Sequence, residues 1–278
     1  MTIQWYPGHM LETENLLKNA IAKTDVVLEI LDARCPDASA NPLLDKLCRK
    51  VFRLKVLNKS DLADPETTDA WLGYFEHRDQ TAAVSICGTQ KSQAEGALNY
   101  CVKRIERNRA RKLKVIVIGI PNTGKSTILN SLAGKKIAKT GNVPAITRHQ
   151  QRTSLNRHID IYDTPGILWP VIEPVEKAYR LAASGAISDT AIDYTEIAYF
   201  IAEFLMQTYP HLLIRRYPFL NPMPDRALAV LDAIGQAKGC LKKGGIVDTQ
   251  KASEALIREL RAGKIGRISF ESPKDLQQ

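Results

Sequence analysis

The sequence "GIPNTGKS" at residues 119–126 decides the fold, because it fits the phosphate-binding pattern G-x-x-x-x-G-K-[ST] in suitable surroundings. The apolar run "LKVIVI" at residues 113–118 comes directly before it, and a helical pattern over residues 124–133 begins inside it. Glycines let the backbone wrap around a phosphate, and the N–H groups at the start of a helix meet its negative charge. A glycine turn with a purely structural role would not need these two neighbours. The stretch therefore predicts a strand, a phosphate loop and a helix in succession.

The side chains of this loop have predicted roles at a bound nucleotide. Lys125 would reach the β- and γ-phosphates, and the Ser126 hydroxyl would bind Mg²⁺. The predicted nucleotide-binding residues of the loop are Asn122, Thr123, Gly124, Lys125, Ser126 and Thr127.

A second phosphate-sensing element lies further along the chain. The tetrapeptide "DTPG" at residues 163–166 follows the apolar run "HIDIY" at residues 158–162. Asp163 would approach the magnesium ion, and the N–H of Gly166 would touch the γ-phosphate. Such a tetrapeptide is common by itself, but downstream of a phosphate loop it is specific. We interpret it as the second switch of a nucleotide-dependent protein.

The segment between these two elements is the expected first switch. It reads "AKTGNVPAITRHQQR" over residues 138–152, and Thr147 is the candidate to complete the magnesium shell, with Thr140 as the alternative. The predicted metal ligands are Ser126, Thr147 and Asp163. Thr147 and Gly166 are therefore also counted as nucleotide-binding residues.

Two upstream loops predict that the base is guanine. "NKSD" at residues 58–61 follows the apolar run "VFRLKVL", and Asp61 would accept hydrogen bonds from guanine N1 and the exocyclic amine, which adenine cannot offer. Asn58 and Lys59 would hold the loop and cover the ring. The next predicted strand ends in "SIC", and its residues Ser85, Ile86 and Cys87 form the expected second base-contacting loop. GTP and Mg²⁺ are the predicted ligands.

The order of these elements is unusual. In an ordinary Ras-like chain the phosphate loop comes first, whereas here both base loops precede it. Circular permutation explains this order, because the old ends of a compact domain often lie close together and can be joined. We expect the new joint within residues 89–112. The new opening falls just after the second switch, which then leads straight into the rest of the chain.

The pattern of apolar residues predicts the fold class. Short apolar runs bounded by turn signals predict strands, and 3.6-residue periodicity predicts helices. The predicted strands are residues 25–31, 51–57, 81–86, 113–118 and 158–162, and the helices among them are residues 8–22, 41–50, 65–77, 89–108 and 124–133. From about residue 175 only helical patterns follow, at residues 189–208, 225–238 and 249–262.

These elements predict an α/β fold: a circularly permuted Ras-like P-loop GTPase domain followed by a small all-helical C-terminal domain. The sheet is expected to be of the parallel type, with helices on both faces. We expect the GTPase domain over residues 1–175 and a helical domain over residues 176–278.

Charge and composition narrow the class of partner and the compartment. The net charge is +9, and no acidic residue lies between Glu106 and Asp160, so a polyanionic partner is expected. The five widely spaced cysteines indicate neither a disulfide framework nor a zinc site. No apolar run has the length of a membrane span, and the first residues lack the pattern of a signal peptide. We therefore expect a cytoplasmic protein.

Several motifs together resemble one family. The chain combines "WYPGHM" at residues 5–10, "DAR" at residues 32–34 with Pro36 shortly after, and the three nucleotide motifs in permuted order. In these features it resembles the ribosome biogenesis GTPase A family, the YlqF-type permuted GTPases, over nearly its whole length. The resemblance implies GTP hydrolysis during late assembly of the large ribosomal subunit. The implied partners are this subunit and its rRNA, bound in the GTP state and released after hydrolysis, with no membrane and no DNA expected.

Two other classes of function stay open at this point. A GTP-dependent switch acting on a protein partner would use the same nucleotide site without binding RNA. An ATPase or a small-molecule kinase would share the phosphate loop but would not need Asp61.

The group that positions the attacking water is not evident from the motifs. Ras-like enzymes place a glutamine directly after D-x-x-G, but here that residue is Ile167. His9 in "WYPGHM" is one catalytic candidate, because an imidazole can orient or deprotonate water, and its alternative is a packing or capping role. Asn122 is the other candidate. In related GTPases an asparagine here helps to hold a monovalent cation such as K⁺, and its alternative role is to bond the loop backbone.

Basic residues of the helical region are the expected RNA contacts, although surface charges that only increase solubility would look the same. These residues are Lys242, Lys243, Arg258, Arg261, Lys264 and Arg267.

Overall fold

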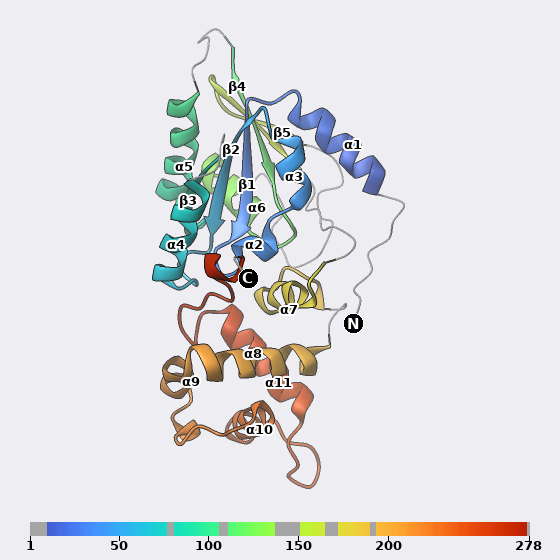
Figure 1. Ribbon diagram of the computed structural model, residues 1–278, viewed down its shortest axis with the longest axis vertical. Coiled ribbons are helices and arrows are strands. Elements are labelled where there is room, and N and C mark those ends of the chain that lie inside the picture. Colours follow the sequence, from blue (N-terminus) through green and yellow to red (C-terminus); the bar gives the residue numbers. More distant parts are fainter. Residues whose placement is uncertain are drawn as a thin grey trace.

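A six-stranded sheet forms the centre of the computed structural model, which describes residues 10–76, 81–105, 111–136, 151–164, 172–189 and 193–276 (Figure 1). The strand order is β3-β2-β1-β4-β6-β5. The strands are β1 Val26–Asp32, β2 Phe52–Asn58, β3 Thr81–Ile86, β4 Leu113–Ile118, β5 Gln151–Asn156 and β6 Ile159–Asp163. All neighbours are parallel except β5 and β6, which are antiparallel.

The sheet is buried on both faces because its central strands are apolar at nearly every position. Val26, Leu28 and Ile30 of β1 pack on one side against α5 (Lys91–Arg104) and α6 (Lys125–Ala133). Val27 faces the other side. Three helices cover that side: α1 (Met10–Ile21), α3 (Pro42–Leu47) and α4 (Pro65–Glu76).

The topology shows how the permuted chain builds this sheet. Strands β1 to β3 run outward from the centre to one edge, and β4 to β6 occupy the other half, so the two halves join along the β1–β4 pair. The carboxyl ends of all five parallel strands lie at the same edge of the sheet. The base loops and the phosphate loops, far apart in the sequence, therefore meet at that edge.

Helices continue the chain beyond the carboxyl edge of the sheet (Figure 1). They are α7 (Val175–Ser184), α8 (Tyr194–Thr208), α9 (Pro210–Arg216), α10 (Ala227–Ala237) and α11 (Thr249–Arg261). Their buried cluster includes the stripe Ile197, Ile201 and Leu205 of α8 and extends to Cys35 next to the short helix α2 (Pro36–Ser39). The helical part and the sheet part thus share a continuous apolar core.

The segment after α11 returns to the sheet part. The N–H of Ile268 donates to the carbonyl of Leu62, and the N–H of Phe270 donates to the carbonyl of Arg34. The indole N–H of buried Trp71 in α4 donates to the carbonyl of Glu271 at 3.1 Å. The short helix η4 (Pro273–Leu276) then packs against α4.

Most predicted elements are confirmed, and three differences have physical reasons. The five predicted strands lie within one residue of their expected positions. Strand β5 was not expected, because "QRTSLN" is polar and forms an edge that needs no apolar alternation. It adds one antiparallel pair to a sheet that is otherwise parallel, as expected. Helix α2 was missed because it is very short.

The predicted helix at 189–208 is shorter than expected. In the structure α8 begins after Asp193, whose carboxylate accepts hydrogen bonds from the N–H groups of Thr195 and Glu196. Helices α7 and α9 were not predicted. In the part of the chain that the structure describes, no helix is both long and apolar enough to cross a membrane.

Buried ion pairs between strands β1 and β2 provide a test of this fold. Glu29 of β1 is fully buried, and its carboxylate lies 2.8 Å from the ammonium of Lys55 and 3.5 Å from the guanidinium of Arg53. We expect Glu29→Ala to lower the free energy of unfolding by about 3–5 kcal/mol, because it leaves buried positive charge without its main partner. Urea unfolding followed by circular dichroism measures the change.

The matched control is Glu95→Ala, which removes an exposed carboxylate that pairs with Lys91 on the surface of α5. An exposed pair of this kind contributes about 0.5 kcal/mol or less. Equal losses in the two variants would contradict a stabilising role for the buried network.

Candidate functional site

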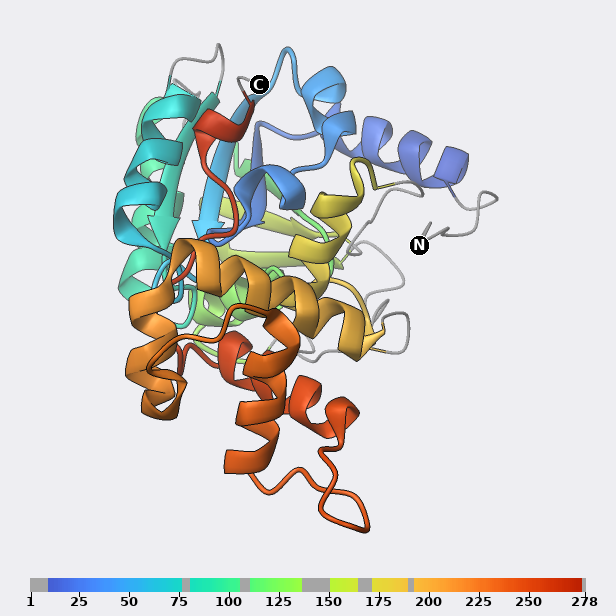
Figure 2. The ribbon, with the colours of Figure 1, turned by 60° about the horizontal axis from the view of Figure 1, so that its bottom comes forward.

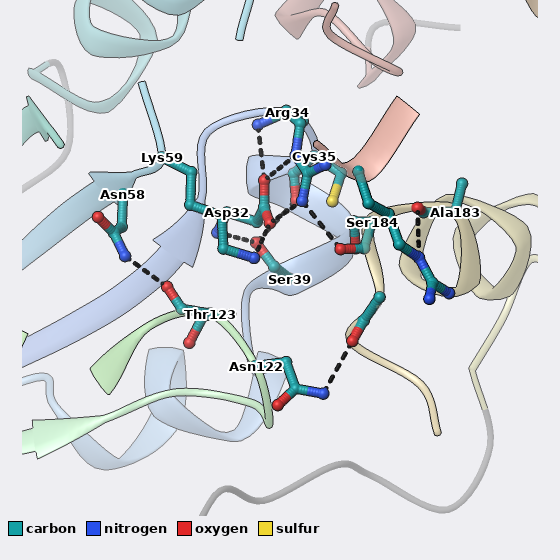
Figure 3. A network of polar contacts seen from close by, with 12 residues as sticks. Asp32, Arg34, Cys35, Ser39, Asn58, Lys59, Asn122, Thr123, Ala183 and Ser184 are labelled. Carbon is teal, nitrogen blue, oxygen red and sulfur yellow. Dashed lines mark hydrogen bonds and ion pairs between the residues drawn. The ribbon is translucent and has the colours of Figure 1, made fainter. Parts of the chain in front are cut away.

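Asn58 is the residue that joins the loops at the carboxyl edge of the sheet (Figure 3). Its side-chain amide donates to the carbonyl of Thr123 in the phosphate loop at 2.7 Å, and its Oδ1 accepts the N–H of Gly88 at 2.8 Å. A Cβ atom at Gly88 would lie 2.7 Å from this oxygen, and one at Gly124 would lie 2.1 Å from its nitrogen. Glycine is therefore required on both sides of a single buried amide.

The phosphate loop has the geometry that anion binding needs. Gly124 adopts a left-handed φ of 97° and caps α6, so that the loop turns directly into the start of the helix. Lys125 is buried, and its ammonium donates to the carbonyl of Ile120 at 2.7 Å. Burial lowers the pKa of Lys125 to about 8, although the charge of Asp163 opposes this effect. A phosphate in the loop would add negative charge beside this ammonium.

The oxygen atoms expected around magnesium come from two neighbouring strand–loop units. Ser126 lies in the first turn of α6, and buried Asp163 ends β6, which pairs with β4 immediately before the phosphate loop. The Thr164 hydroxyl donates to the carbonyl of Val117 at 2.7 Å and fixes the end of β6. A hydroxyl and a carboxylate are suitable ligands for Mg²⁺ when phosphate oxygens supply others, so these residues fit the ion. Among the described residues no group of three or more His, Cys, Asp or Glu side chains could hold a metal.

The first base loop is held in a shape that leaves Asp61 exposed. Lys59 has a positive φ of 61°, and its ammonium donates to the carboxylate of Asp32 at 2.9 Å. The N–H of Ser60 donates to the carbonyl of Ile86, which connects the two base loops. The Asp61 carboxylate therefore has the accessibility that guanine recognition requires.

The second base loop begins where β3 ends, next to Asn58 of β2. Ile86 pairs with Asn58 between β3 and β2, and its side chain lies in the apolar cluster under α5. The N–H of Cys87 donates to the side chain of Gln93 at 2.7 Å. Ser85, near the end of β3, is half-buried. Thr127, in the first turn of α6, is also half-buried. Ser85, Ile86 and Cys87 thus lie at the carboxyl edge of the sheet. The residue of this loop that bonds to Asn58 is Gly88, which the motif did not identify.

Asn122 bonds to a segment outside the phosphate loop. It has a positive φ of 60°, and its Nδ2 donates to the carbonyl of Gly185 at 2.9 Å, directly after α7. The role of Asn122 with a cation stays a prediction, for which its Oδ1 is the relevant atom. The other candidates His9, Thr140, Thr147 and Gly166 lie outside the described residues.

Two groups at this edge, Asp32 and Arg34, were not assigned a role from the sequence, and a third, Arg267, was expected to contact RNA. Asp32 and Arg34 form a buried ion pair at 2.7 Å, and the guanidinium of Arg34 also donates to the carbonyl of Ser184. Arg267 donates to the carbonyls of Ser60 and Ala63. The motif "DAR" was a signal for the first pair, but its partners are distant in the sequence.

Comparisons with known proteins agree with this geometry. A family model described as "50S ribosome-binding GTPase" matches residues 114–209, a range that begins at the strand before the phosphate loop and leaves out the permuted base loops. Ribosome biogenesis GTPase A of Priestia megaterium is 38% identical over 287 residues, covering 100% of this chain and 99% of the relative.

Two solved structures are similar over almost the whole chain. GDP-bound YlqF has a TM-score of 0.70 at 28% identity and covers 94% of this chain and 100% of its own. GNP-bound YlqF from T. maritima has a TM-score of 0.68 at 26% identity and covers 95% of this chain and 99% of its own. The permuted GTPase fold and the helical region that follows it are therefore shared with these proteins.

The lowered pKa of Lys125 predicts a proton linkage of nucleotide binding. Bound phosphates should raise this pKa above about 8, so GTP binding should take up protons, and affinity should fall as pH rises from about 7.5 to about 9. Titration calorimetry in two buffers of different ionisation enthalpy measures the uptake.

Lys125→Arg is the matched control, because a guanidinium stays protonated in this range. Its binding should show less proton uptake than the wild type. The same uptake in both proteins would contradict the assignment of this linkage to Lys125.

Proposed function

The chain belongs to the ribosome biogenesis GTPase A family, and we propose that this GTPase acts in the assembly of the large ribosomal subunit. In this proposal it docks on rRNA with GTP bound and leaves after hydrolysis. The similarity to ribosome biogenesis GTPase A supports the role in assembly. The observation that best supports the GTP site is the junction at Asn58, which brings both base loops and the phosphate loop to one edge of the sheet.

The proposed roles at the nucleotide follow from this arrangement. Asp61 accepts hydrogen bonds from guanine, Lys59 covers the ring, and the phosphate-loop N–H groups with Lys125 bind the phosphates. Ser126, Asp163 and Thr147 would hold Mg²⁺, which neutralises charge that develops on the phosphate oxygens.

Water positioning is proposed to involve His9 or Asn122, as the sequence suggested. The side-chain nitrogen of Asn122 donates to the carbonyl of Gly185, so its Oδ1 is the atom that would bind K⁺. Ile167 supplies no polar atom for this task.

The distribution of charge supports an RNA partner. Part of the basic stretch is neutralised within the fold, because Arg111 pairs with Asp25, and Lys112 and Arg152 pair with Asp160. Other basic residues stay exposed on the sheet part, namely Lys135, Lys136 and Arg157. These exposed charges can meet RNA phosphates.

In the helical part, proposed as a ribosome-binding domain over residues 176–278, the exposed turn at residues 241–247 is the strongest contact candidate. Lys242 and Lys243 lie on this turn, which projects from the end farthest from the sheet (Figures 1 and 2). Lys264 and Arg258 are also exposed, although Arg258 pairs with Glu254. In contrast, Arg261 and Arg267 bond to backbone carbonyls of the protein itself.

One observation favours the alternative, a switch that acts on a protein partner. Leu241 and Ile246 on the same turn are 43% and 69% exposed, and exposed apolar side chains suit a protein surface. The dependence of binding on salt separates the two alternatives.

The first test is GTP turnover with and without large ribosomal subunits, in potassium and in sodium. We expect subunits to increase turnover and His9→Ala to lower the stimulated rate by about a hundredfold while GTP binding survives, because the water loses its orienting group. Stimulation that is indifferent to His9 would move the catalytic role to Asn122 or the RNA. Without any stimulation, the protein-partner alternative would be favoured.

The second test is the salt dependence of binding to large subunits for the double variant Lys242→Gln and Lys243→Gln. If both lysines contact phosphates, the slope of log K against log[salt] should become shallower by about 1.4–1.8. Lys46→Gln with Lys50→Gln is the control, because these exposed lysines lie on the sheet part near α3. Equal changes in the two double variants would contradict a specific contact at the turn.

A further inference from the structure

The end of α7 is a junction between the nucleotide loops and the helical part (Figure 3). The last carbonyl groups of a helix have no partners within it and need donors from elsewhere. Here the carbonyl of Ser184 accepts from the guanidinium of Arg34 at 2.9 Å, and the carbonyl of Gly185 accepts from Asn122 at 2.9 Å. One donor comes from the loop after β1 and the other from the phosphate loop.

Helix α11 also contacts this end of α7. Arg261 at the end of α11 donates to the carbonyl of Ala182 at 2.8 Å and to that of Ala183 at 3.3 Å. It also pairs with Asp189 at 2.9 Å. Four successive carbonyl groups are therefore held by three side chains from three distant parts of the chain.

Arg34 connects this junction to the first base loop through one buried carboxylate. Its Nε and Nη2 donate to the two oxygens of Asp32 at 2.9 and 2.7 Å, and the ammonium of Lys59 donates to the same carboxylate at 2.9 Å. Asp32 is only 1% exposed. Burial alone would raise the pKa of Asp32, but the charges of Arg34 and Lys59 hold it well below its usual range, so the carboxylate stays ionised.

A second contact reaches the same base loop from the segment after α11. Arg267 donates to the carbonyl of Ser60 at 3.0 Å and to that of Ala63 at 2.7 Å, while the N–H of Ile268 donates to Leu62. The loop that carries Asp61 is thus bonded directly to the segment after α11, and it is connected to the end of α7 through Asp32 and Arg34.

We propose that Asp32 and Arg34 are positioning residues for guanine recognition, which tie Lys59 to the end of α7. Guanine binding and the docking of α7 then stabilise each other. The proposal rests on the nucleotide site proposed above, because Lys59 must cover the base for the link to matter. It concerns the base side, so it acts on GDP and GTP alike, in contrast to a switch that senses the γ-phosphate.

An arginine is suited to this position because its planar group has five donors in a fixed fork. Two of them grip Asp32 while a third hydrogen reaches Ser184. A lysine can pair with the carboxylate, but its single ammonium cannot maintain the bidentate grip and the bond to α7 together. Arg34→Lys therefore keeps the charge and removes the bridge.

The experiment measures GDP and GTP affinities of four proteins: wild type, Arg34→Lys, Arg261→Gln and the double variant. We expect Arg34→Lys to weaken both nucleotides equally, by about five- to twentyfold. Arg261→Gln is remote from the base loop, and it should weaken both by a smaller factor because α7 docks less firmly. In the double variant, the second substitution should add less than it does alone, because only the bond of Asn122 to Gly185 then still joins α7 to the nucleotide loops.

A second readout separates positioning from general stability. In the wild type, GDP should slow amide hydrogen exchange in α7 and in the phosphate loop. In Arg34→Lys, saturating GDP should slow exchange in the phosphate loop as in the wild type but should slow it less in α7, where only the bond from Asn122 to Gly185 remains. Unchanged affinities in Arg34→Lys, or fully additive effects in the double variant, would overturn the proposal. If Arg34→Lys does not fold, unchanged GDP affinity in Arg261→Gln overturns it.

Asp61→Asn tests the underlying site independently. Xanthine has an oxygen in place of the guanine amine, so an amide at residue 61 should shift preference from GDP towards XDP. Without that shift the assignment of the base site itself fails. With the shift but without an effect of Arg34→Lys, only the positioning role of Arg34 fails.

Discussion

The side chain of Asn58 is the constraint on which the nucleotide site depends. Its amide donates to Thr123 and accepts from Gly88, so one buried group fixes the distance between the phosphate loop and both base loops. These contacts are noncovalent, so they do not depend on the order in which the chain supplies the loops. The permutation could therefore move the chain ends without moving the site, provided that β1 and β4 still pair at the centre of the sheet.

The features that could be predicted from the sequence are those whose causes lie within one short segment of the chain. The five parallel strands were predicted because burial on both faces favours apolar residues at most positions, and the phosphate loop because its glycines and lysine act within one short segment. Strand β5 was missed because an exposed edge imposes no apolar pattern. The partners of Arg34 and Asn122 could not be predicted, because the carbonyls they bind come from the end of α7, and any residue type can supply a carbonyl.

The positive charge of the chain has two different roles in the structure. Some basic side chains connect distant parts of the chain, as in the contacts of Arg261 and Arg267 with backbone carbonyls. Others, including Lys242 and Lys243, lie on exposed turns. Net charge alone cannot distinguish these roles, because the distinction depends on which carbonyls and carboxylates the fold brings within reach.

The return of residues 267–271 to the sheet part has a consequence for synthesis. The indole N–H of Trp71 donates to the carbonyl of Glu271, which lies 200 residues later in the chain, and the carbonyl of Leu62 accepts from the N–H of Ile268. A ribosome makes these residues long after the sheet strands have emerged. The base loop of a nascent chain thus lacks its final supports until residues 267–271 have been made and have emerged from the ribosome.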